Sequence, residues 1–291
     1  MEGVLIVNKP ASWTSHDVVQ KARGILKERR IGHTGTLDPL ATGVLVLCVG
    51  RATRIARHLE AQDKEYHAHL RLGVTTDTLD SDGSVCEQRE YAPPSRERLL
   101  DVMRSFLGDQ MQRPPAYSAV KVSGVPSYRL ARAGNAVELA PRPVSVRHIE
   151  LTSYEDPVVG FSVVCSKGLY VRTLCSEIGE ALGSGAHLTG LERIRSGPFT
   201  IEAAHTLEQI EACRMAGTLE GLLLSMDQAL ADLPLVELSE ADTRRISQGN
   251  RLSWESATDS PHYVRIHTPE GALLAIARIA AGMLRPETVF S

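Results

Sequence analysis

The residues with the clearest chemical potential form one block, Gly32-His33-Thr34-Gly35-Thr36-Leu37-Asp38-Pro39-Leu40-Ala41-Thr42-Gly43. Its glycines, hydroxyl side chains and Asp-Pro step predict a tight loop whose backbone approaches a ligand closely, with the carboxylate of Asp38 inside it. The block lacks the lysine of a P-loop and the G-x-G-x-x-G spacing of a dinucleotide site. From these residues alone, an ordinary turn in which Asp38 binds local amides fits equally well.

Two other groupings could hold a metal ion, but each lacks ligands. Asp80-Ser81-Asp82-Gly83 suggests a calcium loop, yet the EF-hand frame puts Thr78 at its first position and Arg89 at its twelfth, where a bidentate glutamate is required. His67 and His69 share one face of an expected strand without a third ligand, so they are interpreted as a solvent-facing pair. The sequence therefore predicts no metal site.

The elements that must position Asp38 follow from the apolar pattern. Residues 3–7 suit a buried strand, residues 18–26 a helix capped by Thr14 or Ser15, and residues 44–49 a second strand. From Tyr66 the period becomes two, which is typical of a half-buried strand with Tyr66, Ala68, Leu70 and Leu72 on one face. Further elements are expected as a helix from near Ser95 to Gly108, strands at 144–151 and 161–165, and a helix at 171–182.

This mixture predicts an α+β fold with a central mixed or antiparallel sheet flanked by helices, because regular βαβ alternation is absent. A boundary is expected near Leu233-Pro234. Beyond it the pattern predicts a helix at 239–247 and strands at 263–267 and 273–277, which together form a small β-rich unit. We therefore expect domains at residues 1–233 and 234–291.

Composition limits the function classes. The chain has 291 residues, of which 43% are hydrophobic, enough for a substantial core. The formal net charge of -3 argues, as an average, against a nucleic-acid partner. Residues 44–49, the longest apolar run, fall far short of the ~18 residues of a membrane span. Five scattered cysteines and the absence of a basic N-terminal leader predict a cytoplasmic protein without disulfides.

Three stretches carry a resemblance to a known family: Asn8-Lys9-Pro10, the block at 32–43, and Lys167-Gly168-Leu169-Tyr170-Val171-Arg172-Thr173. They resemble the bacterial tRNA pseudouridine-55 synthases of the TruB family, and the resemblance runs over almost the whole chain. It implies a pseudouridine-synthase fold that isomerises uridine 55 in the TΨC loop of tRNA by base flipping. No cofactor and no metal are implied.

The resemblance also implies roles. Asp38 matches the family's nucleophile, and a carboxylate suits a reaction that breaks an N-glycosidic bond, because carboxylates stabilise or trap cationic sugar character. Arg172 matches the arginine that pairs with the nucleophile and keeps it ionised. Tyr66 matches a tyrosine lying against the target base, where stacking is worth ~1–3 kcal/mol. Its periodicity alone would also suit a core tyrosine.

Other positions match substrate contacts. Tyr170 and Leu191 match pocket positions, and His33 matches a histidine that contacts the extruded nucleotides. An insertion at about residues 110–143 resembles the family's RNA-gripping segment, with Lys121, Arg129 and Arg132 as expected RNA contacts, although a solvated loop would also suit its Pro-Pro step. Arg129 and Arg132 are three apart and would share one side of a helical turn. The last 58 residues, 234–291, look like a PUA domain, an RNA-binding module.

The partner implied is the T-arm of tRNA, bound by a monomer that needs no protein partner and no membrane. Two alternatives stay open. One is a synthase with another RNA target, such as the guide-RNA-dependent dyskerin type, whose lysine-rich tail or extension is not seen here. The other is an RNA-binding chaperone of tRNA folding with secondary catalysis, against which the joint presence of Asp38, Tyr66 and Arg172 speaks.

The net charge is uneven along the chain. Residues 1–60 hold nine Lys and Arg against five Asp and Glu, and residues 113–153 hold six against two. These stretches contain the Asp38 loop and the expected RNA grip. A locally basic face on an acidic protein still binds phosphate, with fewer ion contacts and a shallower salt dependence than a strongly basic binder. The sequence therefore predicts affinity that rests more on RNA shape than on bulk charge.

Overall fold

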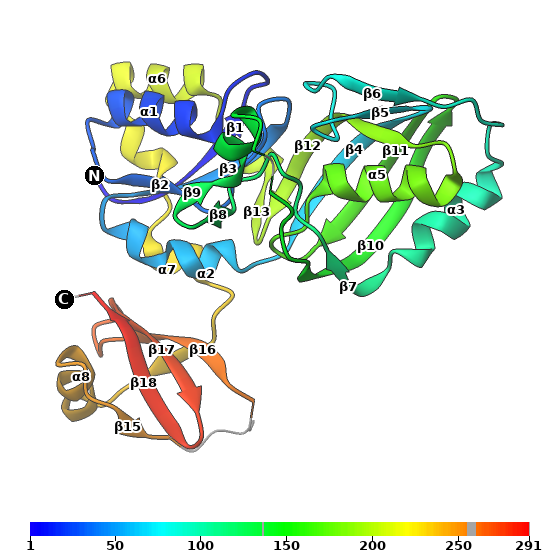
Figure 1. Cartoon of the computed structure of the whole chain (residues 1–291). Coiled ribbons are helices and arrows are strands. Elements are labelled where there is room, and N and C mark those ends of the chain that lie inside the picture. The colour runs from blue at the N-terminus through cyan, green and yellow to red at the C-terminus, as the bar shows by residue number, and fades with distance from the viewer. Residues whose placement is uncertain (136, 255–259, 291) are drawn as a thin grey trace.

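The computed structural model describes residues 1–135, 137–254 and 260–290. Its chain forms a large mixed sheet with helices packed on it, and a smaller β unit below (Figure 1). The expected α+β class is confirmed. In spatial order, the main strands are β1 (Gly3–Lys9), β3 (Thr42–Val49), β12 (Ala186–Ser196), β4 (Lys64–Leu72), β11 (Val158–Cys165), β10 (Arg142–Glu155) and β7 (Gly108–Gln112).

Two short strands extend this sheet: β2 (Ile31–His33) pairs with β3, and β13 (Phe199–Thr200) pairs with β12. Only the β3–β12 pairing is parallel among its described pairs. Gly43 of β3 allows this contact, because a Cβ there would lie 2.3 Å from the carbonyl oxygen of Arg193 on β12. The parallel contact brings the end of the Asp38 loop beside β12.

The predicted helices form where the apolar spacing placed them. α1 (Ser15–Leu26) begins at the N-cap Thr14 with a capping box to Asp17, and α5 (Val171–Leu182) has the predicted bounds. The remaining helices are α2 (Ala56–Glu60), α3 (Arg96–Ser105), α4 (Ser127–Arg132), α6 (Leu207–Ala216), α7 (Met226–Ala229) and α8 (Glu240–Ser247), with 3-10 turns η1 (Gly50–Ile55), η2 (Ile201–Ala203) and η3 (Leu219–Leu222).

One helix end differs from the prediction. α3 ends at Ser105, three residues before Gly108. The amides of Phe106 and Leu107 end the helix by donating to carbonyls three residues earlier, those of Met103 and Arg104, both at 3.1 Å. Gly108 then pairs with Val146 of β10 as the first residue of β7. Strand pairing therefore ends this helix before the glycine.

The sequence pattern gave no signal for β12, although it lies at the centre of the large sheet. Its burial pattern lacks a period of two, and its register against β4 shifts twice. By contrast, β4 buries alternate residues from Lys64 to Leu72, as predicted from the period at Tyr66. A bulged strand loses the alternation that makes a strand visible in sequence.

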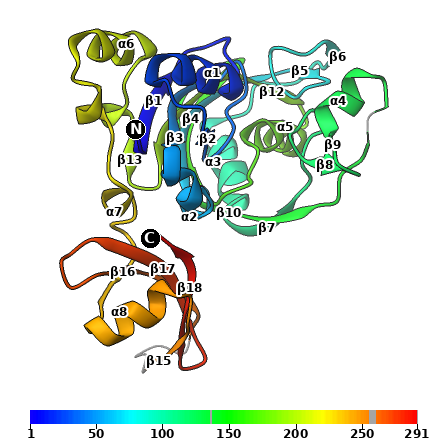
Figure 2. The same cartoon turned by 90° about the vertical axis from the view of Figure 1, so that its left-hand side faces the viewer.

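Two short hairpins form separate two-stranded sheets outside the large sheet. β5 (Val74–Thr76) pairs with β6 (Val85–Gln88), and β8 (Lys121–Val122) pairs with β9 (Val125–Pro126). The second hairpin and α4 belong to the segment between β7 and β10, which stands out from the sheet on the side where α5 packs (Figure 2). This segment is the insertion expected from the sequence to grip RNA.

The smaller sheet begins at Leu235, just beyond the expected boundary. Its strands are β14 (Leu235–Glu237), β16 (His262–His267), β17 (Leu273–Ala280), β18 (Met283–Val289) and β15 (Leu252–Ser253). Ile276 packs with residues of β1 and β3 in one hydrophobic cluster. Asp227 Oδ1 of α7 accepts bonds from Arg265 Nη1 and His267 Nε2, both 2.7 Å. These contacts fix the small unit below the large sheet.

No helix within the described ranges is long and apolar enough to cross a membrane.

Candidate active site

The loop that carries Asp38 connects β2 to β3 and is anchored by the first residue of α1. Ser15 Oγ accepts a bond from the amide of Leu37 (2.8 Å) and donates to its carbonyl (3.1 Å). Leu37 and Ala41 are buried on either side of Asp38. The loop is therefore held by its neighbours, and the Asp38 side chain keeps 29% of its surface exposed.

Lys9, at the end of β1, ties this loop to the N-terminal strand. Its side chain is fully buried, and Nζ donates to the carbonyls of Pro10 (2.9 Å), Trp13 (2.5 Å) and Pro39 (3.2 Å). Burial lowers the pKa of the Lys9 ammonium to about 8, while nearby Asp38 opposes the shift. Lys9 entered the sequence analysis only as part of a matching motif, because a single lysine carries no spacing signal.

Arg172, the second residue of α5, reaches Asp38 from across the sheet. Its Nε lies 3.2 Å from Asp38 Oδ2, and its Nη2 donates to Asp38 Oδ1 at 3.3 Å. The guanidinium also donates to the carbonyls of Tyr117 (2.7 Å) and Thr78 (3.3 Å). With only 4% of the residue exposed, Arg172 is buried and still fully charged, since arginine does not deprotonate in proteins. The structure thus brings Arg172 and Asp38 together as an ion pair, and their roles in a reaction stay a prediction.

A second carboxylate lies on the other side of this arginine. Asp80, in the turn between β5 and β6, is buried and has its Oδ2 3.6 Å from Arg172 Nη1. Thr78 Oγ1 and the amide of Asp82 donate to Asp80 Oδ1 at 2.5 and 3.1 Å. In the sequence, this Asp-Ser-Asp-Gly stretch resembles only an incomplete calcium loop. No group of acidic, histidine or cysteine side chains in the described part of the chain could hold a metal ion.

The charges around Asp38 act in opposite directions. Burial raises the pKa of the Asp38 carboxyl above its ordinary value, Arg172 opposes this rise, Asp80 and Asp82 add to it, and Lys9 opposes it. The neighbouring guanidinium favours the ionised form of the carboxyl, against the effect of burial. The arrangement thus places one partly exposed carboxylate beside a buried guanidinium.

Asp80→Asn is expected to lower the pKa of the Asp38 carboxyl, because a negative neighbour is lost and Arg172 is left with one carboxylate partner. A titration followed by carbon-13 NMR of the aspartate side chains measures this. Asp82→Asn is the matched control and should give a smaller fall, since Asp82 is exposed and acts on Asp38 more weakly. An unchanged or higher pKa in the Asp80 variant would contradict the expectation.

Tyr66 and Tyr170 lie close enough to Asp38 for its charge to act on their phenols, and Leu191 lies on the strand beside Tyr66. Tyr66 on β4 is 8% exposed and pairs with Arg193 of β12. Burial raises the pKa of its phenol, Arg193 lowers it, and Asp38 contributes to the rise. Tyr170 stands just before α5, with its ring 5.8 Å from the Arg172 guanidinium carbon. Leu191, half-buried, pairs with Ala68 two residues along the same two strands.

Arg193, which was not predicted from the sequence, also holds the Asp38 loop in place. It is 2% exposed, and it donates to the carbonyls of Val44 (2.7 Å) and Gly35 (3.1 Å). Arg193 therefore binds β12 to both ends of the Asp38 loop. Arg193 was not predicted because β12, the strand that carries it, was not recognised in the sequence.

Four predicted substrate contacts have no described bond to Asp38. His33 ends β2 at the start of the same loop, and burial lowers the pKa of its imidazole, with Arg193 adding to the effect. Lys121, Arg129 and Arg132 are exposed on the insertion. The two arginine groups lie 6.0 and 5.9 Å from the Tyr128 ring centre, so they share one side of α4 as predicted. Their contact with RNA stays a prediction.

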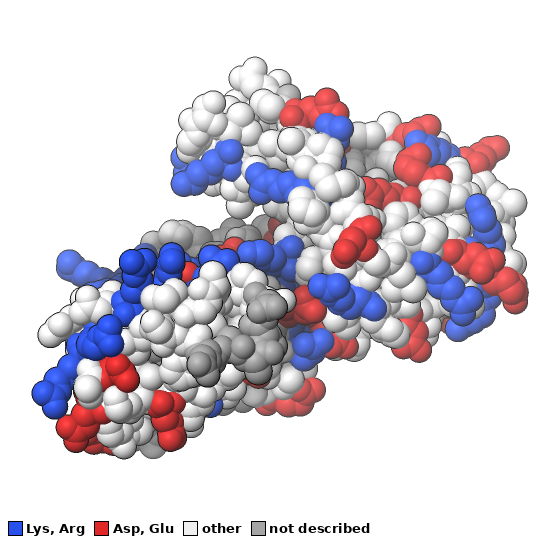
Figure 3. Space-filling view, turned by 90° about the horizontal axis from the view of Figure 1, so that it is seen from below, with Lys and Arg blue, Asp and Glu red and all other residues white. Residues whose placement is uncertain are grey.

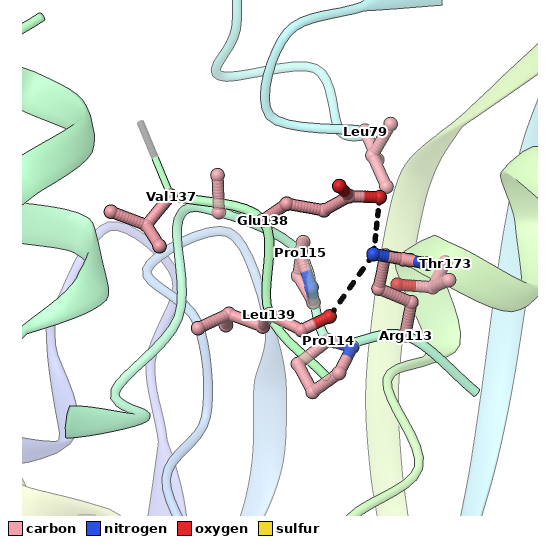
Figure 4. A pocket seen from close by; sticks show the side chains of 9 residues that line it. Leu79, Arg113, Pro114, Pro115, Val137, Glu138, Leu139 and Thr173 are labelled. Atoms are coloured by element: carbon pink, nitrogen blue, oxygen red, sulfur yellow. Dashed lines mark hydrogen bonds and ion pairs between the residues drawn. The ribbon is translucent and has the colours of Figure 1, made fainter. Parts of the chain in front are cut away.

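A recess of about 460 Å³ lies between the two roots of the insertion, residues 113–116 and 137–139 (Figure 4). Arg113 bridges the roots, with an ion pair to Glu138 and a 3.3 Å bond to the carbonyl of Leu139. Thr173, the neighbour of Arg172, lies in its wall with an unpartnered buried Oγ1. Other residues lining the recess are Leu79, Pro114, Pro115, Ala116 and Val137.

Comparisons with known proteins agree along the whole chain. Residues 23–171 match the model of the TruB family pseudouridylate synthase N-terminal domain. Residues 172–231 match the tRNA pseudouridylate synthase B C-terminal domain, and residues 234–290 match the model described as pseudouridine synthase II TruB, C-terminal.

Similar curated proteins carry the name tRNA pseudouridine synthase B. The protein of Ralstonia nicotianae is 42% identical, covering 99% of this chain and 93% of its own, and that of Thiobacillus denitrificans is 42% identical over 100% and 96%. Among solved structures, a chain of a Cbf5-Nop10-Gar1 complex has a TM-score of 0.79 at 28% identity, covering 99% of this chain and 85% of its own. A chain of an H/ACA RNP bound to a substrate RNA has a TM-score of 0.76 at 26% identity, over 99% and 85%.

Proposed function

The chain belongs to the TruB family of pseudouridylate synthases, and from this we propose that it isomerises uridine to pseudouridine in tRNA, at position 55 of the TΨC loop, with Asp38 as nucleophile. The relatives named tRNA pseudouridine synthase B, at about 42% identity over nearly full length, support tRNA as the substrate. The likeness to the Cbf5 chain is lower in identity, at 28%. This favours a tRNA target over another RNA.

The observation that carries the proposal is the ion pair between Asp38 and Arg172. A partly exposed carboxylate held by a buried guanidinium, near Tyr66 and Tyr170, suits attack on an extruded nucleoside. A glycosidase normally needs a second carboxyl group to activate water or protonate the leaving group. Here the other carboxyl group, Asp80, is buried and bound to Thr78, Asp82 and Arg172, which fits a reaction that keeps the base and excludes water.

The two tyrosines near Asp38 support base flipping. Taking a base out of a folded loop costs a few kcal/mol, which stacking and edge hydrogen bonds in a pocket must offset. Tyr66 is 8% exposed and pairs with Arg193 of β12, so only a small part of its side chain is free to meet a base. Two tyrosines suffice for a single flipped uridine, whereas a platform that stacks several bases would need more aromatic residues than the 4% of this chain.

The RNA-binding surface is proposed on the side where the insertion stands out. From below, Lys and Arg side chains line both sides of a hollow, while the right half of that view mixes acidic and basic groups (Figure 3). Lys121, Arg129 and Arg132 would contact phosphates from the insertion, and His33 would contact the displaced nucleotides. Residues 234–291 would act as a PUA-like auxiliary grip, and residues 1–233 as the catalytic unit, in a cytoplasmic monomer that needs no protein partner.

The decisive experiment incubates the protein with unmodified tRNA transcripts and maps pseudouridine by mass-spectrometric sequencing. We expect one modified site, the T-loop uridine. A transcript with that uridine replaced by cytidine is the control and should remain unmodified. Product at other positions, or in another RNA only, would contradict the assigned site. Tight tRNA binding without any product would instead favour the chaperone function.

A further inference from the structure

A buried glutamine joins the root of the insertion to the start of α5. Gln112 is the last residue of β7 and is 1% exposed. Its Oε1 accepts a bond from the amide of Tyr170 at 2.8 Å, and its Nε2 donates to the carbonyl of the same residue at 3.2 Å. The side-chain amide therefore pairs with Tyr170 as the backbone of a neighbouring strand would.

Tyr170 is the point at which α5 begins. It is the N-cap residue, its backbone is extended, and it has no side-chain cap bond. Its carbonyl already accepts the first helical bond, from the amide of Leu174 at 3.1 Å. Without Gln112, the amide of Tyr170 would have no described protein partner. An unsatisfied buried amide is unfavourable, so the pairing fixes where the helix starts.

The same segment contacts the catalytic arginine. Arg172 follows Tyr170 by two residues, and its Nη2 donates to the carbonyl of Tyr117, five residues after Gln112. Burial raises the pKa of the Tyr170 phenol, and the neighbouring Ser118 side chain lowers it. The insertion root therefore meets the start of α5 at three places, of which only the Gln112 contact holds the backbone itself.

We propose that Gln112 is a positioning residue: by fixing the backbone of Tyr170, it holds the Arg172 guanidinium against Asp38. The proposal rests on the proposed function for its kinetic consequences, but its geometric consequence does not depend on it. Asp38 and Arg172 meet at 3.2 and 3.3 Å, and a displacement of about 1 Å at such a contact can cost about 100-fold in rate.

The test is Gln112→Met, which keeps the length of the side chain and removes both hydrogen bonds. We expect kcat on a tRNA transcript to fall about 10- to 100-fold, with KM unchanged, because the insertion surface that would contact RNA is untouched. The acid limb of the pH profile should move to higher pH, since Arg172 opposes the raised pKa of Asp38. Gln20→Met is the matched control, at an exposed position of α1 whose side chain bonds His16 and Arg23, and should behave as wild type.

A purely structural role would lower the melting temperature and the active fraction without moving the acid limb. Carbon-13 titration of Asp38 in the variant gives a readout independent of turnover, with a higher pKa than in the wild type expected. Should the methionine variant not fold, Gln112→Glu keeps the bond from the Tyr170 amide and loses the donation to its carbonyl; a lower kcat at constant KM is again expected. If the wild type is active and the variants keep its kcat and its Asp38 pKa, the positioning role of Gln112 is overturned and the proposed function is not. If the wild type itself is inactive on tRNA, the proposed function is overturned.

Discussion

Asp38→Asn is expected to abolish pseudouridine formation while tRNA binding survives, which is the largest effect expected for any single substitution in the protein. The amide keeps the shape of the side chain but cannot attack as a carboxylate does, so turnover should fall by about four orders of magnitude or more. Arg172 keeps Asp80 and the carbonyls of Tyr117 and Thr78 as partners. The fold around the loop should therefore persist.

Binding should be unchanged or slightly tighter, because a negative charge is removed from a surface that meets a polyanion. Single-turnover assays with excess enzyme measure the chemical step, and filter binding of the same transcript measures affinity. Asp101→Asn, on the exposed face of α3, is the control and should keep full activity. Wild-type turnover in the Asp38 variant would show that Asp38 is not the nucleophile.

Much of this site was predictable because its signals are local. The loop block at residues 32–43, the N-cap of α1 and the period-two pattern at Tyr66 each depend on neighbours in sequence, and the structure has the loop, the cap and the strand as expected. Arg172 came from the motif resemblance. Its buried contact with Asp38 spans 134 positions in the chain, and no periodicity encodes such a distance.

The partners of Arg172 and Asp38 were less predictable for the same reason. In the sequence, Asp80 appears only within a rejected calcium-loop pattern and Gln112 only within the expected RNA-gripping insertion. Their contacts with Arg172 and Tyr170 exist only once β5, β7 and α5 are placed together. Arg193 was missed with its whole strand, because the bulges in β12 remove alternation. Contacts between distant segments depend on tertiary packing, which single-sequence patterns do not contain.

Replacing Arg172 by Met is the second large change, and it should affect both rate and stability. Turnover at neutral pH is expected to fall about 100- to 1,000-fold, the usual cost of losing one electrostatic contact in a closed site. Arg172 lowers the pKa of Asp38 against burial and the two acidic neighbours. Its loss should raise that pKa further, so the acid limb of the residual activity moves to higher pH.

The stability effect follows from burial. The side chains of Arg172 and Asp80 are each 5% exposed, and removing one partner of a buried ion pair costs about 3 to 5 kcal/mol because the other charge is left uncompensated. Urea unfolding measures the free energy of unfolding. Arg195→Met is the control: its pair with Glu65 is about one-third exposed, and such pairs are worth about 0 to 1 kcal/mol.

The pH dependence of this loss has a definite sign. A carboxyl whose folded-state pKa lies above its unfolded value takes up a proton earlier in the folded state, so the folded state gains relative stability as pH falls through that range. In Arg172→Met the raised pKa of Asp38 should therefore make the stability gap to the wild type narrow as the pH falls below neutrality. Adding Asp80→Asn removes the second orphaned charge and should recover part of the loss at neutral pH. A gap that widens in acid, or a double variant no more stable than the single one, would show that Arg172 stabilises this site by packing and not by its charge.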